Sequence, residues 1–297
     1  MPSRFFEIFK LTTFSLGIIL IANLVFSVLY HQFVYTVVLN DRLPPELTEG
    51  LSEDASNPSV SFTESYNKVR SAIELLEKDL QAELKENSEK VFENFYDIML
   101  KDKPYLLFFQ SLIWFVSFIG LGYLILKKLL KLNLTDMSDE LSIPILLNGI
   151  MNGFTIFFIV ILFGVILKLL NIDANPGLFP AKLFKELQGN GVLLAWSIYS
   201  VGIITGIIEE LFFRGFLLKI FIDKDLANEG LMIISIIFGY LHFGIGTTIA
   251  VPFMISIVGM FFGYLYIKNK NIWVSIACHA TYNSLGLLVA YAGGESL

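Results

Sequence analysis

The sequence contains few charged residues, a single cysteine and only three histidines. Charged residues make up 16% of the 297-residue chain, whereas hydrophobic residues make up 55% and the mean hydropathy is +0.68. A soluble domain of this length would need far more charged surface, so the composition predicts a polytopic membrane protein. Strands with alternating apolar and polar residues, which an outer-membrane barrel requires, are not seen. We therefore expect an all-α fold, a bundle of transmembrane helices in the cell membrane.

The lone cysteine and the acidic charge balance exclude two kinds of site and one kind of partner. Cys278 has no second cysteine, so we expect no disulfide within the chain and no cysteine-cluster metal site. Lys and Arg number 21 against 27 Asp and Glu, and no stretch has the basic footprint of a nucleic-acid-binding surface. The expected partner of most of the chain is the lipid bilayer, and nucleic acid is not an expected partner.

Hydrophobic runs predict about seven membrane spans. The first follows Arg4 and Lys10, as in a signal peptide, but it is long for a signal core and no small-x-small cleavage site follows it. We therefore expect a retained first helix. The expected spans cover 13–30, 105–126, 143–170, a run that begins near Gly191, the short run 231–243, 248–267 and 272–292.

Basic residues predict the orientation of these spans. If seven spans alternate, four basic clusters fall on one side, which the positive-inside rule assigns to the cytoplasm. The N-terminus is then cytoplasmic, and residues 31–104 are extracytoplasmic. The clusters are Arg4/Lys10, Lys127/Lys128/Lys131, Lys219/Lys224 and Lys268/Lys270.

The hydrophilic residues 31–104 form an acidic insertion between the first two spans. Residues 43–45 and 51–61 have the composition of irregular linkers. From residue 62 to residue 100, apolar side chains recur at helical spacing, which predicts amphipathic helices. The insertion is either a module that binds a substrate or protein partner, or a helical hairpin that packs against the outer loops. The expected domains are the anchor 1–30, the insertion 31–104, the second and third spans with their loop at 105–190, and the core 191–297.

Two acids and an arginine interrupt the fourth span. Ionisable groups in a membrane are costly and are found mainly where they have a function. Glu210 and Arg214 are four residues apart and share one helix face, whereas Glu209 points about 100° away. We predict that Glu210 and Arg214 form a structural ion pair and that Glu209 remains available for chemistry.

Three further polar side chains lie in the last apolar spans. His242 ends one run, while His279 and Asn283 are four residues apart and share a helix face. At about 1.5 Å per residue, Glu209, His242 and His279 each lie roughly 15–20 Å from the nearest loop, near the middle of the membrane. We therefore predict that these three side chains surround one cavity, open to the cytoplasmic side.

The chemistry of this set is that of a hydrolase. A carboxylate in an apolar pocket, helped by an imidazole, can hold and deprotonate a water molecule. Imidazole and carboxamide N–H groups can stabilise the resulting oxyanion, so the set predicts an acyl hydrolase without a covalent nucleophile. We expect Cys278 not to be the nucleophile, because adjacent helical residues point apart and a lipid-buried thiol stays protonated.

A metal is the alternative to this metal-free reaction. Zinc bound by Glu209, His242 and His279 is chemically sensible. However, the sequence has no HExxH spacing, and Glu209 cannot easily be both ligand and base. We therefore expect that no cofactor is required, with a divalent metal such as zinc as the alternative.

In their order, the three motifs resemble those of the CPBP family of membrane proteins. The motifs are Glu209-Glu210-x-x-x-Arg214, Phe238-x-x-x-His242 and His279-x-x-x-Asn283, on successive apolar helices. This family includes CAAX prenyl proteases and bacteriocin-processing or immunity-associated proteins, relatives of the type II CAAX endopeptidase. The resemblance covers residues 191–292, and it explains neither the first span nor the acidic insertion.

The resemblance implies a role for each residue of these motifs. Glu209 would be the general base, His242 would orient the water, and His279 and Asn283 would stabilise the oxyanion. Glu210, Arg214 and Phe238 would support the site. Members of the family are called metalloproteases, although a metal-free reaction that depends on glutamate is similarly compatible with these motifs.

These observations lead to one preferred function and two alternatives. We expect an intramembrane endopeptidase that cleaves a membrane-associated or lipidated protein. The first alternative is a non-catalytic scaffold or bacteriocin self-immunity protein that binds a partner through residues 31–104. The second is a proton- or ion-coupled transporter, which is disfavoured because no inverted repeat is detected.

Overall fold

The computed structural model describes residues 3–45, 62–125, 128–129, 131 and 140–293, and the regular elements in these residues are all helical. The all-α fold class is therefore confirmed. The linker predicted at 51–61 and the basic residue Lys127 lie outside the described residues. The chain divides into two compact units, one made of Met1–Ser27 with Pro104–Leu297 and the other of Val28–Lys103. Helix α1 (Arg4–Arg42) contributes to both units.

Among its described residues, the smaller unit, Val28–Lys103, contains three elements besides the end of α1. Asn87 separates the two α-helices, because its side chain caps the second one by accepting a hydrogen bond from the Lys90 backbone N–H at 3.2 Å. Phe95 is fully buried and packs edge-on against Tyr30 and Phe33. The helical periodicity predicted for residues 62–100 is thus confirmed. The elements are α3 (Phe62–Glu86), α4 (Ser88–Asp97) and the π-helical η1 (Ile98–Asp102).

The larger unit contains the apolar helices expected of a membrane bundle. Within the described residues, five helices are long and apolar enough to cross a membrane, and two shorter apolar helices accompany them. All seven lie where the hydrophobic runs place the spans, and the number that cross the membrane stays a prediction. The long helices are α1, α7 (Ile143–Leu169), the continuous helix Gly191–Ile222, α13 (Ala250–Asn269) and α14 (Ile272–Tyr291). The shorter ones are α5 with η2 (Leu106–Trp114, Phe115–Gly120) and α12 (Ala227–Tyr240).

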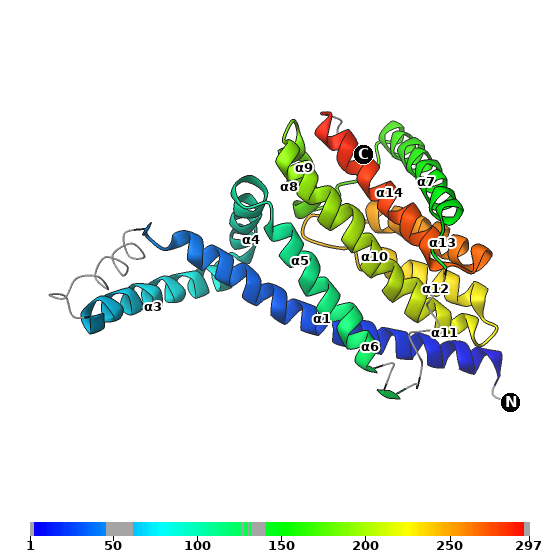
Figure 1. Ribbon diagram of the computed structural model, residues 1–297, viewed down its shortest axis with the longest axis horizontal. Coiled ribbons are helices and arrows are strands. Elements are labelled where there is room, and N and C mark those ends of the chain that lie inside the picture. Colours follow the sequence, from blue (N-terminus) through cyan, green and yellow to red (C-terminus); the bar gives the residue numbers. More distant parts are fainter. Residues whose placement is uncertain (1–2, 46–61, 126–127, 130, 132–139, 294–297) are drawn as a thin grey trace. The chain divides into compact units, whose positions relative to one another are not determined.

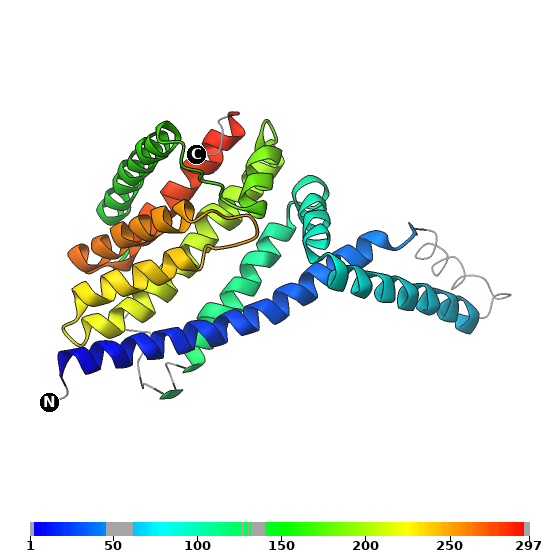
Figure 2. The same ribbon diagram turned by 180° about the vertical axis from the view of Figure 1, so that it is seen from behind.

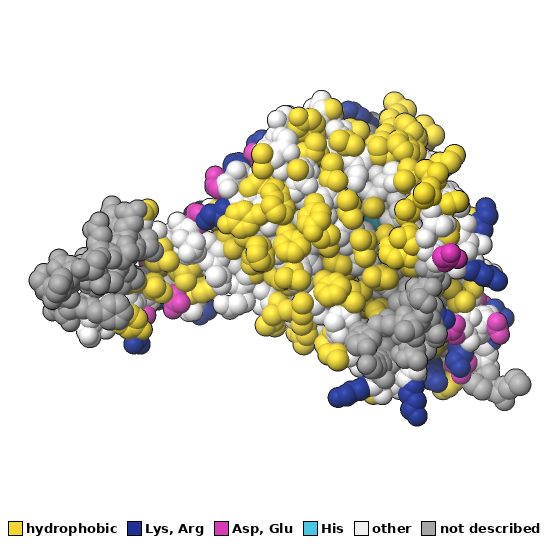
Figure 3. Space-filling model, in the orientation of Figure 1, with side chains coloured by type: hydrophobic (Ala, Val, Ile, Leu, Met, Phe, Trp, Pro, Cys, Tyr) yellow, Lys and Arg dark blue, Asp and Glu magenta, His cyan; other side chains and the backbone are white. Residues whose placement is uncertain are grey.

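The outer face of α7 shows the surface that lipid would cover. Met151, Phe158 and Leu169 are 70%, 62% and 76% exposed, and hydrophobic side chains cover most of the visible face of the larger unit (Figure 3). Such a continuous apolar surface is typical of a protein that contacts lipid or another protein. The composition and this surface together show a membrane protein.

Close helix packing holds the larger unit together, and α7, α13 and α14 lie side by side in both ribbon views (Figures 1 and 2). A Cβ atom at Gly149 of α7 would lie 2.5 Å from the Ala277 Cβ of α14, so this approach requires glycine. A second close approach is at Gly202, where a Cβ atom would lie 2.7 Å from the Ser284 hydroxyl oxygen.

Hydrogen bonds also fix which helix ends lie together. Arg4, at the start of α1, pairs with Glu229 at the start of α12, with 2.6 Å between Nη2 and Oε1. Asn148 of α7 donates to Asn269 of α13 at 3.1 Å. The N-terminus accordingly lies near the start of α12 in both ribbon views (Figures 1 and 2).

Candidate active site

The predicted base and its acidic neighbour lie in the middle of the long helix Gly191–Ile222. The N-cap of this helix is Asn190, whose side chain accepts a hydrogen bond from the Leu193 N–H at 3.0 Å. It alternates α-helical and π-helical turns, and Glu209 and Glu210 end the short α-helical stretch between two π-helical ones. Such wide turns occur frequently at functional sites. The stretches are α9 (Gly191–Ser197), η5 (Ile198–Ile204), α10 (Thr205–Glu210), η6 (Leu211–Leu218) and α11 (Lys219–Ile222).

Glu210 and Arg214 form the ion pair that the sequence predicts. The Arg214 Nη1 donates to Glu210 Oε1 at 2.8 Å, and its Nη2 donates to the Gly259 carbonyl of α13 at 2.6 Å. Glu210 is fully buried and Arg214 is 1% exposed. The guanidinium carbon also lies 4.7 Å from the centre of the Phe238 ring, a cation–π contact. Arg214 therefore joins η6 to α12 and α13.

His279 of α14 contacts both glutamates. Its Nδ1 lies 2.8 Å from Glu210 Oε1, and its Nε2 lies 3.8 Å from Glu209 Oε2. Since Glu210 accepts from Arg214 as a carboxylate, Nδ1 donates to it and Nε2 faces Glu209. The Phe262 ring stacks on the imidazole at 4.5 Å. The contact between His279 and Glu210 was not predicted from the sequence.

His242 follows α12 and is oriented by that helix. Its Nδ1 lies 2.8 Å from the Phe238 carbonyl oxygen, which can only accept, so Nδ1 carries the proton and Nε2 is the acceptor. The Phe238 ring packs edge-on against the imidazole at 4.8 Å. The loop after His242 is attached to the start of α8 (Leu178–Leu187), because the Leu178 N–H donates to the Ile245 carbonyl at 2.8 Å.

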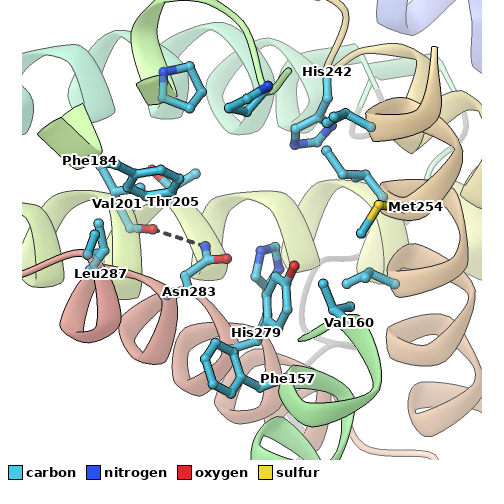
Figure 4. A pocket seen from close by; sticks show the side chains of 18 of the residues that line it. Phe157, Val160, Phe184, Val201, Thr205, His242, Met254, His279, Asn283 and Leu287 are labelled. Carbon is cyan, nitrogen blue, oxygen red and sulfur yellow. Dashed lines mark hydrogen bonds between the residues drawn. The ribbon is translucent and has the colours of Figure 1, made fainter. Parts of the chain in front are cut away.

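Asn283 lies one turn after His279 on α14. Its Nδ2 donates to the Val201 carbonyl of η5 at 3.2 Å, the bond drawn in Figure 4. A carboxamide has two N–H bonds, so one remains for a ligand. Asn283 and His279 point into the same cavity, and His242 faces them from across it (Figure 4).

The structure brings the four predicted catalytic residues to one cavity of about 360 Å³. Glu209, His242, His279 and Asn283 all line it, together with Phe238, whereas Glu210 and Arg214 lie behind the wall. The remaining lining is largely apolar. It includes Phe157, Val160, Phe179, Phe184, Val251, Met254, Val258 and Leu287. This combination of an apolar cavity with a few convergent polar groups is typical of a binding or catalytic site.

Comparison with known proteins assigns a family to this part of the chain. Residues 191–285 match the family model for type II CAAX prenyl endopeptidase Rce1-like proteins. These residues form an Rce1-like domain. The resemblance predicted from the three motifs is thereby confirmed, and the domain contains all of the motif residues. No curated protein and no solved structure matches the chain.

The Rce1-like domain supplies donor types that suit zinc, but their positions do not form a metal site. Among the described residues, no group of three His, Cys, Asp or Glu side chains could hold a metal ion. We therefore assign no catalytic step to a metal in this arrangement.

Cys278 lies outside the cavity of the Rce1-like domain. It is fully buried and packs with Val258 and Phe262 in the hydrophobic core between α13 and α14. It is absent from the residues that line the cavity. This position agrees with the expectation that the thiol is not a nucleophile.

Two groups of the Rce1-like domain were not predicted as part of the site. The Gly259 carbonyl accepts from Arg214, and the Phe262 ring stacks on His279. In the sequence, the spacing of Gly259 and Gly263 by four residues is a signal of close helix packing and of nothing more specific. A backbone acceptor and an aromatic ring in an apolar helix have no sequence signature of their own, so neither contact could be inferred from the motifs.

Proposed function

We propose that the protein is an intramembrane endopeptidase of the CAAX type, which hydrolyses a peptide bond of a membrane-associated or lipidated protein. The observation that carries this proposal is the cavity that Glu209, His242, His279 and Asn283 line together within an Rce1-like domain. The apolar remainder of the lining suits a lipid chain or apolar side chains of the substrate.

Glu209 acts as the base in the proposed reaction. A water molecule between Glu209 and the His242 Nε2 is oriented by both acceptors, and Glu209 removes its proton. The water oxygen then bonds to the carbonyl carbon of the substrate. Glu209 later returns the proton to the leaving nitrogen as the carbon–nitrogen bond breaks, which yields a carboxylic acid and an amine.

Asn283 and His279 stabilise the oxyanion in this proposal. The second N–H of Asn283 is available to donate. His279 can donate from Nε2 only when that nitrogen is also protonated, because Nδ1 is bonded to Glu210. The proton that Glu209 receives lies within reach of Nε2, since the two side chains are 3.8 Å apart. Activation of the water and stabilisation of the oxyanion would thus be coupled through one proton.

A comparison of two glutamate variants tests the proposal. The purified protein in detergent should cleave a lipidated membrane peptide, and Glu209→Gln should lower turnover by about 10²–10⁴-fold, the usual contribution of a general base. Glu140→Gln is the control, because this exposed residue precedes α7 away from the cavity. Equal turnover of Glu209→Gln and the control would contradict the proposal. Loss of activity with a strong chelator, restored by zinc, would contradict the metal-free reaction.

A further inference from the structure

A second, smaller cavity meets the proposed catalytic residues from the side of α5. It has a volume of about 190 Å³, and Glu209 and His242 line both cavities. Its other wall comes mainly from α5, which packs against η5 and α10 (Figure 1) and lies outside the matched domain. The α5 residues that line it are Leu107, Gln110, Ser111 and Trp114.

Gln110 supplies an amide group with unused hydrogen-bonding capacity. Its Oε1 is buried and has no hydrogen-bond partner among the described residues. The neighbouring Ser111 hydroxyl is already engaged, since it lies 3.1 Å from the Leu107 carbonyl and 3.3 Å from the Ser200 carbonyl. A buried amide oxygen without a partner is costly, so a rotation of the amide that brings this oxygen to a donor on a ligand in the cavity gains binding free energy.

The wall that carries Gln110 is fixed by packing. The Trp114 ring contacts the rings of Phe26 and Phe118, with 4.5 Å between ring centres in each pair. The bond between Ser111 and the Ser200 carbonyl attaches the same helix to η5. A side chain on such a fixed element can bind a ligand without first paying for the ordering of the helix.

We propose that this smaller cavity is a substrate subsite for the peptide main chain on one side of the scissile bond. Gln110 would bond to a peptide group through its amide, which offers both an acceptor and donors, and Trp114 would form the apolar wall. The volume of about 190 Å³ is below the usual range for a whole small-molecule ligand, roughly 300–1,000 Å³, so it suits a short stretch of peptide. The inference rests on the proposed function, because Glu209 and His242 must lie at the scissile bond.

Binding of a lipidated peptide to the Glu209→Gln protein tests the subsite without cleavage. Adding Gln110→Leu should raise the Kd about three- to tenfold, the loss expected for one hydrogen bond. The control is Phe109→Leu, because Phe109 is 45% exposed and does not line the cavity. Gln110→Leu should not lower the thermal stability, since it replaces a half-buried amide, whose buried oxygen has no partner among the described residues, by an apolar group of similar size.

Binding of peptides shortened from either end identifies which side of the scissile bond occupies the subsite. Shortening from one end should abolish the difference in Kd between the two proteins, while shortening from the other end should preserve it. In the active protein, Gln110→Leu should raise KM for the full-length peptide and leave kcat within about twofold.

The outcomes distinguish a failure of the subsite proposal from a failure of the proposed function. An unchanged Kd, the same increase for all shortened peptides, or no peptide binding at all would overturn the subsite. If the peptide binds with the expected dependence on Gln110 but the protein with Glu209 intact does not cleave it, the role of Gln110 in peptide binding holds. The endopeptidase assignment, and with it the placement of the cavity beside a scissile bond, then fails.

Discussion

Arg214 and His279 both contact the same oxygen of Glu210, so this one carboxylate holds two other charged or polar groups in place. Its partner oxygen, Oε2, is buried without a hydrogen bond among the described residues. A buried carboxylate of this kind is tolerated because the guanidinium compensates its charge. Glu209, by contrast, faces the cavity and pairs with no arginine among the described residues.

The two glutamates should therefore respond differently to neutralisation. Glu210→Gln should lower the free energy of unfolding by about 3–5 kcal/mol, because it leaves Arg214 buried without a counterion. Glu209→Gln should leave that free energy nearly unchanged. Unfolding in mixed detergent measures both. Equal stability of the two variants would contradict the division between a structural and a catalytic acid.

Gly259 gives a second prediction for a single residue. A Cβ atom there would lie 2.8 Å from the Phe238 ring and 3.3 Å from Arg214 Nη2, so Gly259→Ala should destabilise the protein by about 1–3 kcal/mol. Gly17→Ala is the matched control, because no atom lies within 4 Å of the new Cβ and alanine favours a helix. Thermal unfolding in detergent should show a lower Tm for the first variant alone.

For single residues, the sequence predicted which side chains lie close together but not all of their contacts. The pair Glu210–Arg214 followed from a spacing of four, which any helix brings to one face. The approach of Glu209, His242 and His279 to one cavity followed from their similar depth. The bond from His279 to Glu210 depends on how far α14 is rotated about its axis. The spacing of residues within one helix does not determine that angle.

The helices themselves explain why such rotations are not predictable. A helix that is apolar on all sides has no polar face to indicate its orientation, and α7, α13 and α14 are of this kind. Their positions along the chain were predicted from hydrophobic length alone. Their contacts instead depend on small residues such as Gly149, whose role appears only when the neighbouring helix is known.

The smaller unit provides a prediction for its helices α3 and α4. The hydrogen bond from Arg42 to Glu83, 2.6 Å long, and nearby Lys90 hold the pKa of Glu83 below its ordinary value of 4.5. A lowered pKa means that the stabilisation is present above pH 4.5 and is lost as the pH falls through the folded-state value.

Hydrogen exchange checks this expectation. Protection factors of α3 amides, corrected for the intrinsic exchange rate, should fall when the pH is lowered from 6 to about 3. In Arg42→Met the protection should already be lower at pH 6, and it should change less over this range. A pH dependence identical in the two proteins would contradict the role of the Arg42–Glu83 pair.

The whole protein has a predicted orientation in the membrane. We propose that Arg4 and the other basic clusters are cytoplasmic and that residues 31–104 are extracytoplasmic. The contact between Arg4 and Glu229 supports part of this arrangement, because it brings the start of α1 to the same end as the segment that carries Lys219 and Lys224. Figure 3 shows Lys and Arg side chains around this end.

Cysteine labelling tests the orientation. Cys278 is fully buried, so the unsubstituted protein should react little with a membrane-impermeant maleimide. Lys224→Cys should react only when the reagent reaches the cytoplasmic face, whereas Leu75→Cys, at a position 61% exposed, should react in intact cells. Labelling of both variants from the same face would contradict the predicted orientation.

The direction in which Glu209 and Glu210 point from the axis of the helix Gly191–Ile222 depends on the number of residues before them in that helix. Successive residues in an α-helix are about 100° apart, so deleting one residue from the α-helical stretch Gly191–Ser197 would turn everything after it by that angle relative to everything before. The two acids would then lose His279 and the cavity even though no motif residue had changed. Homologues that keep the three motifs but differ in length within this helix should therefore differ in activity, and motif matching alone would not distinguish them.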